Sequence, residues 1–87
     1  MQQIMDLTRM NPGERGVIIE IQGGWGLLNR LETLGIRPNV EITKISSQLA
    51  RGPVTVQVGN TQAALGFGMA MKVIVQLIPQ ENTAQEK

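Results

Sequence analysis

Apolar and polar residues alternate along four short stretches of the chain, which is the period of a β-strand with one face in a core. The stretches are residues 17–22, 40–45, 54–58 and 73–77. In the first, Val17, Ile19 and Ile21 share one face, which is typical of a half-buried strand. The turn Gly59-Asn60 follows the third stretch and predicts a hairpin whose second strand is residues 61–65. The pattern therefore predicts about five strands.

A different period covers residues 27–34, whose leucines stand at positions 27, 28, 31 and 34. This spacing places the leucines along one side of an amphipathic helix. Gly35 suits the left-handed position that follows a helix end, and Pro38 blocks any continuation. Ile36 can then contact Leu31, as the residue after such an end often does. We expect one short helix between the first two strands.

Turn residues separate these elements. Pro12-Gly13 and Pro38-Asn39 each place proline before a residue that tolerates positive φ, as a type II turn requires. Residues 66–70 are rich in glycine and favour a single turn of 3₁₀ or α-helix over a strand. Chain reversals are therefore expected at all three places.

One domain is expected over residues 1–78, followed by a disordered tail over residues 79–87, which lack the apolar side chains that a core requires. Short strands joined by tight turns, with a single helix, suit a mainly β fold of the small SH3-like β-barrel class. A parallel α/β sheet would need a crossover helix between most strands. Because the 87 residues include no cysteine, the core alone must stabilise this fold.

The absence of cysteine and histidine excludes several kinds of chemistry. Cys-His and Ser-His nucleophiles need a histidine base, and soft-ligand metal sites need thiolate or imidazole. The acidic residues show no compact ligand spacing, and the glycines form no nucleotide-binding motif. The remaining reactive groups, Lys44, Ser46 and Ser47, are expected at a strand end and in the loop after it. We therefore predict no catalytic, cofactor-binding or metal-binding residue, and no enzyme.

Charge on this chain is low and evenly spread. Eight Lys or Arg oppose seven Asp or Glu, which gives a net charge of +1. No basic cluster with interleaved aromatic residues indicates a nucleic-acid surface, and no apolar run is long enough to span a membrane. Asp6 stands where a signal peptide has its apolar stretch. We expect a cytoplasmic protein without nucleic-acid binding or membrane insertion, whose weak charge permits a homo-oligomer.

Several individually ordinary motifs follow one another in a distinctive order between residues 6 and 77. They are Leu7, Pro12-Gly13-Glu14, Gly16-Val17, Arg30-Leu31, Leu34-Gly35-Ile36, Pro38, Gly52-Pro53-Val54, Ala64-Leu65, Ala70, Val73 and Val75. In this order they resemble the FeoA family of ferrous iron transport accessory proteins. The resemblance implies a cytoplasmic SH3-like protein that binds and modulates FeoB, a membrane ferrous iron transporter. Labels of iron or transition-metal binding attach to the family through this pathway and do not imply ligands in this chain.

The chain departs from the family pattern in two places. Asn39 stands where the family has glycine, and residues 66–68 stand where it often has a basic residue. Similar SH3-like domains also form the C-terminal domain of iron-dependent repressors, although nothing here resembles the DNA-binding region that precedes them. A self-associating structural module is the other alternative.

Five residues are candidate partner contacts. Trp25 stands among glycines before the helix, where it can anchor a partner or cover one end of the barrel. Phe67, with Met69 nearby, can adapt to a partner surface or plug the bottom of the barrel. Asn29 and Arg30 belong to the outer face of the expected helix, which equally suits a solvated surface.

Overall fold

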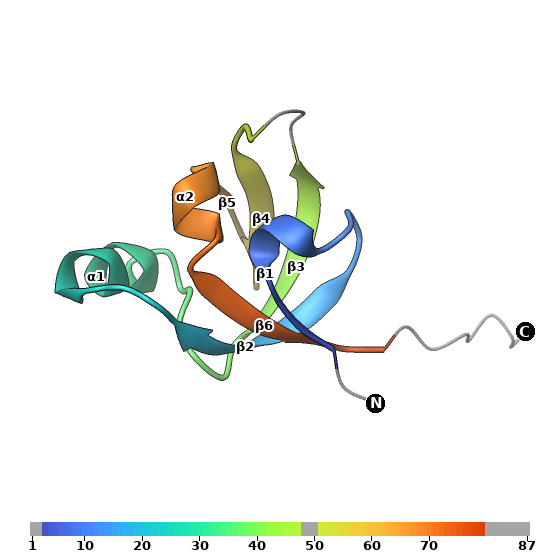
Figure 1. The fold of residues 1–87 in the computed structure, drawn as a ribbon, viewed down its shortest axis with the longest axis horizontal. Helices are drawn as coiled ribbons and strands as arrows, with labels where there is room; N and C mark the ends of the chain where they lie inside the picture. Colours follow the sequence, from blue (N-terminus) through green and yellow to red (C-terminus); the bar gives the residue numbers. More distant parts are fainter. Residues whose placement is uncertain (1–2, 48–50, 80–87) are drawn as a thin grey trace, which may run out of the picture.

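A computed structural model describes residues 3–47 and 51–79 as a curved antiparallel sheet with three short helical segments (Figure 1). In chain order the elements are β1 (Ile4–Asp6), the 3₁₀ helix η1 (Leu7–Arg9), β2 (Arg15–Ile21), α1 (Trp25–Glu32), β3 (Glu41–Ser47), β4 (Val54–Val58), β5 (Thr61–Leu65), α2 (Phe67–Ala70) and β6 (Val73–Leu77). The predicted fold class, mainly β with one amphipathic helix, is confirmed. The helix was expected between the first two of about five strands. It follows β2 in a described sheet of six strands, because β1 precedes it. Apart from Pro79, the predicted tail lies outside the described residues.

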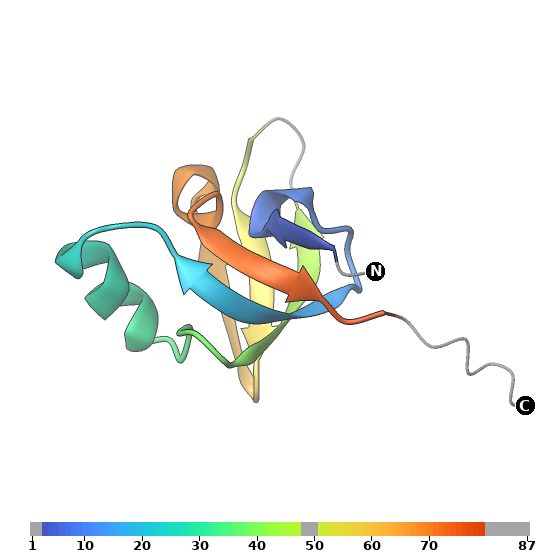
Figure 2. The same cartoon turned by 60° about the horizontal axis from the view of Figure 1, so that its bottom comes forward.

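The strands form one sheet in the order β1-β6-β2-β3-β4-β5, with every pairing antiparallel. The short strand β1 was not predicted, because three residues are too few to show an alternating pattern. The edge strands of the sheet are β1 and β5. The helix η1, which follows β1, packs against α2, which follows β5. Helix α1 connects β2 to β3 in the chain and lies to one side of the sheet in both views of the molecule (Figures 1 and 2).

The core lies inside the curve of the sheet and consists of aliphatic side chains from most of the elements. Its buried members are Leu7, Met10, Ile18, Leu31, Ile36, Ile42, Val54, Val56, Leu65, Ala70, Val73 and Val75. Helix α1 contributes only Leu31 to this buried set. Leu27, also in α1, packs against this core while it is only partly buried. Full burial of one leucine contributes about 1.5–3 kcal/mol, so Leu31 is the strongest single attachment of α1 to the sheet.

The turn after α1 has the geometry that Gly35 and Ile36 predict. Gly35 has a φ of 83°, and its N–H donates to the carbonyl of Glu32 at 2.9 Å. The N–H of Ile36 donates to the carbonyl of Leu31 at 3.0 Å. This pair of bonds is the Schellman motif, which satisfies carbonyls that the helix end leaves free.

The prediction that Val17, Ile19 and Ile21 share one face of β2 is wrong. Ile18 is buried and Ile19 is exposed, whereas the strict alternation placed Ile19 with Val17 and Ile21. The pairing of β2 with β6 shifts register between Ile18 and Glu20, so one extra residue interrupts the period of two. Ile21 thereby returns to the core side, where it packs against the buried cluster.

Candidate functional site

Lys44 is the one buried charged residue that the structure describes, with 1% of its surface exposed. Its ammonium donates to three backbone carbonyls, those of Leu7 at 2.9 Å, Thr8 at 3.2 Å and Met10 at 2.6 Å. The expectation that Lys44 stands at a strand end is therefore wrong, because β3 continues to Ser47. It occupies the inward face of β3 two residues after Ile42, and the N-terminal segment covers it.

Burial lowers the pKa of Lys44 below its ordinary value, because the charged form loses its hydration. The carboxylates of Asp6 and Glu14 oppose this shift by attracting the ammonium. The three carbonyls replace part of the lost hydration, and they belong to η1 and the residue that ends it. A cation at the end of a helix is also favoured by the partial negative charge of its carbonyls. Lys44 therefore fixes η1 against β3.

Hydrogen bonds within the segment complete the shape of η1. Asp6 caps its start, because the N–H of Thr8 donates to Asp6 Oδ1 at 2.8 Å and the Thr8 hydroxyl donates to the same oxygen. Arg9 Nε lies 3.8 Å from Asp6 Oδ2. The carboxylate of Asp6 is thus occupied by groups of its own segment, and this segment forms one wall of a cavity.

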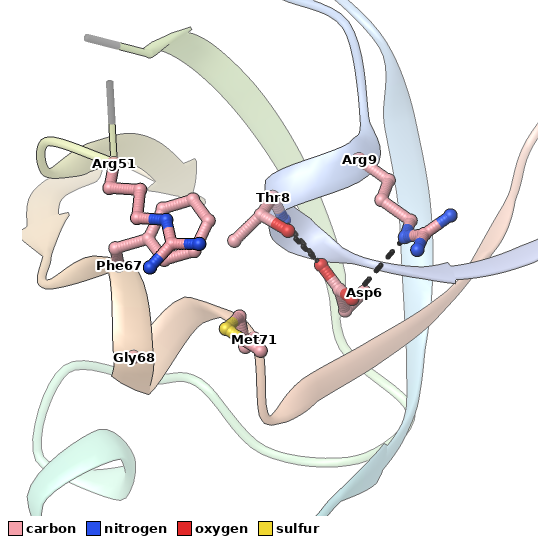
Figure 3. A pocket seen from close by; sticks show the side chains of 7 residues that line it. All are labelled: Asp6, Thr8, Arg9, Arg51, Phe67, Gly68 and Met71. Atoms are coloured by element: carbon pink, nitrogen blue, oxygen red, sulfur yellow. Dashed lines mark hydrogen bonds and ion pairs between the residues drawn. The ribbon is translucent and has the colours of Figure 1, made fainter. Parts of the chain in front are cut away.

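The cavity, called here the Arg51 pocket, has a volume of about 500 Å³ and lies between η1, α2 and the turn before β4 (Figure 3). Its lining residues are Asp6, Thr8, Arg9, Arg51, Phe67, Gly68 and Met71. The Arg51 guanidinium lies over the Phe67 ring, 5.9 Å from its centre, which is a cation–π arrangement. Met71, which is 48% exposed, supplies an apolar wall beside them.

Arg51 is one of two described non-glycine residues with positive φ, at 63°, and Asn39 is the other, at 75°. Asparagine visits this region readily, whereas an arginine there has unfavourable contacts between its Cβ and the backbone. The side chain of Arg51 is exposed, and in the described part of the chain no carboxylate lies within ion-pair distance of it. Its guanidinium donors therefore face solvent at the pocket.

The structure separates the five candidate contacts into two groups. Trp25, Asn29 and Arg30 lie exposed on α1. Trp25 exposes 79% of its surface, so of its two alternatives the one in which it covers the barrel end is wrong. Phe67 and Met69 lie on α2. Met69 packs against the core, whereas Phe67 lines the Arg51 pocket and is absent from the buried cluster, so it does not plug the barrel.

Sequence reasoning missed the polar half of the Arg51 pocket. Asp6, Thr8 and Arg9 belong to η1, and Arg51 is more than 40 positions away in the chain. No local motif signals a contact that forms only when the sheet closes around its core. The glycine pair around Phe67 was the one available signal, and it indicated the α2 side of the pocket.

Within residues 3–47 and 51–79, no three Asp or Glu side chains gather where they could hold a metal ion. A second, smaller cavity of about 330 Å³ is lined by Glu41, Thr43, Gln57 and Gly59, and its Glu41 already pairs with Arg15 at 2.8 Å. No helix in the described residues has the length and apolar character to cross a membrane.

These features define a small, mainly β domain with an SH3-like fold. The FeoA domain model matches residues 5–77, so the chain belongs to the FeoA family. Membership of this family confirms the prediction that the chain is not an enzyme. A candidate Fe(2+) transport protein A of Methanocaldococcus jannaschii is 33% identical over 64 residues, which are 74% of this chain and 76% of that protein.

Solved structures give the same family and fold. A crystal structure of an iron uptake regulatory protein, FeoA, superposes with a TM-score of 0.79 and 30% identity, over 87% of this chain and 99% of that one. The FeoA of Stenotrophomonas maltophilia, a procaryotic SH3 domain protein crystallised with zinc, gives a TM-score of 0.71 and 27% identity, over 82% of this chain and 88% of that one.

Proposed function

We propose that this chain is a cytoplasmic accessory protein of ferrous iron transport, which binds the cytoplasmic part of a FeoB-type membrane transporter and modulates it. The observation that carries the proposal is the FeoA match over residues 5–77, nearly all of the described chain. The relative from Methanocaldococcus jannaschii supports it, because its name assigns it to Fe(2+) transport. Ferrous iron is then the cargo of the transporter, and this chain, which has no cysteine or histidine, contributes a contact surface.

The exposed residues on α1 support a role in partner contact. Trp25 exposes 79% of its surface, although an indole is costly to hydrate and is enriched at binding hot spots. Asn29 and Arg30 stand on the same helix and offer polar groups to the edge of such a contact. Phe67 and Met69, on α2, form the second proposed contact region.

A titration followed by NMR tests the proposal. Trp25 is the single tryptophan of the chain, so a ¹⁵N-labelled sample has one indole N–H resonance, which needs no assignment. Adding the unlabelled cytoplasmic part of the transporter is expected to shift or broaden this signal. Spectra that stay unchanged up to high micromolar concentrations of the partner would contradict the proposal.

Self-association needs a separate control, because contact between copies would also shift the indole signal. Light scattering over a dilution series of this chain alone measures its mass. A monomer at every concentration, together with an indole shift on adding the partner, is the expected result. A shift that follows the concentration of this chain without any partner would instead favour the self-associating module.

A further inference from the structure

We propose that the Arg51 pocket binds an acidic segment of the partner protein, in which a carboxylate side chain stands next to an apolar one. This inference rests on the proposed function, since it names the surface and the chemistry of the same contact. Its volume of about 500 Å³ falls within the usual range for binding sites, roughly 300–1,000 Å³. The pocket exceeds what a single buffer ion fills, and it accommodates side chains of a peptide.

Charge complementarity selects the carboxylate. Arg9 and Arg51 face the pocket with one acidic residue, Asp6, so the lining carries a net positive charge. The Asp6 carboxylate already accepts from Thr8 and pairs with Arg9. Arg51 has no such partner in the described residues, and a guanidinium can donate two parallel hydrogen bonds to one carboxylate. An incoming Asp or Glu therefore binds at Arg51.

The apolar side of the pocket selects the neighbour of that carboxylate. The Phe67 ring lies next to the Arg51 guanidinium at the pocket, as Figure 3 shows. Met71 lies beside this pair with a flexible thioether side chain that adapts to different apolar shapes. A free inorganic anion would leave both apolar groups uncovered, whereas an acidic-apolar segment covers them.

The backbone at Arg51 gives a second, independent reason to assign this residue a binding role. Its φ of 63° favours glycine, and the chain carries glycine at the next position instead. A strained residue that persists at a pocket is typical of a functional position. Arg51→Gly should therefore fit the backbone better than the natural residue does, while it removes the guanidinium.

This relation makes Arg51→Gly a sharp test. We expect its melting temperature to equal or exceed that of the wild-type chain, and its affinity for the cytoplasmic part of the transporter to fall at least ~10-fold. Phe67→Ala should weaken binding in the same direction. The matched control is Arg37→Gln, which removes an exposed arginine outside the pocket and should change the affinity less than ~2-fold.

The possible results separate the inference from the proposed function. If the wild-type chain fails to bind the transporter part, both fail. If the wild-type chain binds and Arg51→Gly binds equally well, the pocket assignment alone is wrong. Overlapping peptides from the transporter part identify the segment, and those that bind should carry Asp or Glu beside an apolar residue. Binding of basic peptides only, competition by inorganic phosphate at micromolar concentration, or a dimer that Arg51→Gly abolishes would each overturn the inference.

Discussion

The ammonium of Lys44 lies 2.6 Å from the carbonyl oxygen of Met10, a residue 34 positions earlier in the chain. The same ammonium donates to the carbonyls of Leu7 and Thr8. One buried cation thus ties the N-terminal segment to the middle of the sheet. Because that segment carries Asp6, Thr8 and Arg9 into the Arg51 pocket, Lys44 supports the pocket without lining it.

Lys44→Met should destabilise the protein by about 2–4 kcal/mol. Methionine has a similar length and fills the same space, but it cannot donate to the carbonyls of Leu7, Thr8 and Met10. In the variant, the Leu7 carbonyl still accepts a hydrogen bond from the N–H of Met10 at 3.3 Å. The loss of stability therefore comes mainly from the carbonyls of Thr8 and Met10, which lose their donor. Urea unfolding followed by circular dichroism measures the change.

The control for this substitution is Lys72→Met. Lys72 is exposed and follows α2, so the same chemical change there should alter the free energy of unfolding by less than about 0.5 kcal/mol. If the two variants lost equal stability, or if Lys44→Met lost none, the carbonyl contacts would not hold η1 in place.

The stability contributed by Lys44 should depend on pH. Burial, the larger cause, lowers the pKa of Lys44 in the folded chain, and the nearby carboxylates of Asp6 and Glu14 reduce that shift without reversing it. Between this lowered pKa and the ordinary value of 10.5, the unfolded chain binds the proton more strongly than the folded chain does. Stability therefore rises with pH through that window, because deprotonation relieves the cost of a buried charge.

The measurement compares unfolding free energies of the wild-type chain and Lys44→Met at several pH values from neutral toward 10.5. Subtracting the two removes the titration of all other groups. The advantage of the wild-type chain should widen as pH increases, by at most about 1.4 kcal/mol per pH unit. A gap that narrows with rising pH would mean that the folded chain raises the pKa of Lys44.

Two glycine substitutions should have opposite effects on stability. A Cβ at Gly16 would lie 3.0 Å from the backbone carbonyl oxygen of Gln76 and 3.2 Å from Val75 Cβ, so β2 and β6 must move apart to admit it. Gly16→Ala should cost about 1–3 kcal/mol. Gly26, in α1, has open space around its Cβ position, and Gly26→Ala should stabilise by up to about 1 kcal/mol. Thermal unfolding of both variants decides whether β2 and β6 are this close.

Trp25→Ala should leave the fold intact while it weakens partner binding. With 79% of the Trp25 surface exposed, its removal should change the free energy of unfolding by less than about 0.5 kcal/mol. The affinity for the transporter part should fall roughly 10-fold or more if Trp25 is a hot spot. Calorimetric titration suits this variant, which lacks the indole signal, and equal affinity of the two chains would remove Trp25 from the contact surface.

The parts of the fold that local chemistry determines were predictable from the sequence. Gly59-Asn60 indicated the hairpin of β4 and β5, and Gly35 indicated the end of α1, because each turn needs a residue that accepts positive φ. Gly13 has a φ of 93°, and the N–H of Glu14 donates to the carbonyl of Asn11, as the type II turn requires. Such signals lie within four residues of the structure that they specify.

The features that sequence reasoning missed depend on contacts between distant segments. The bulge at Ile19 separates Ile19 from the core-facing residues of β2, and an alternating pattern cannot show where an extra residue interrupts it. Lys44 lies on the same inward face of β3 as Ile42. In the sequence, a lysine at this position indicates a strand end, because the carbonyls that accept its hydrogen bonds come from a distant segment. The Arg51 pocket needs η1 and α2 side by side, which only the closed sheet provides.

The Lys44 contacts also bear on how a mutational scan of this protein should be interpreted. The ammonium holds Leu7, Thr8 and Met10 in place from inside the molecule, where no partner can reach it. A substitution at Lys44 would therefore disturb the wall of the Arg51 pocket without removing any group that lines it. Only a stability measurement beside each affinity measurement would distinguish such a supporting residue from a contact residue.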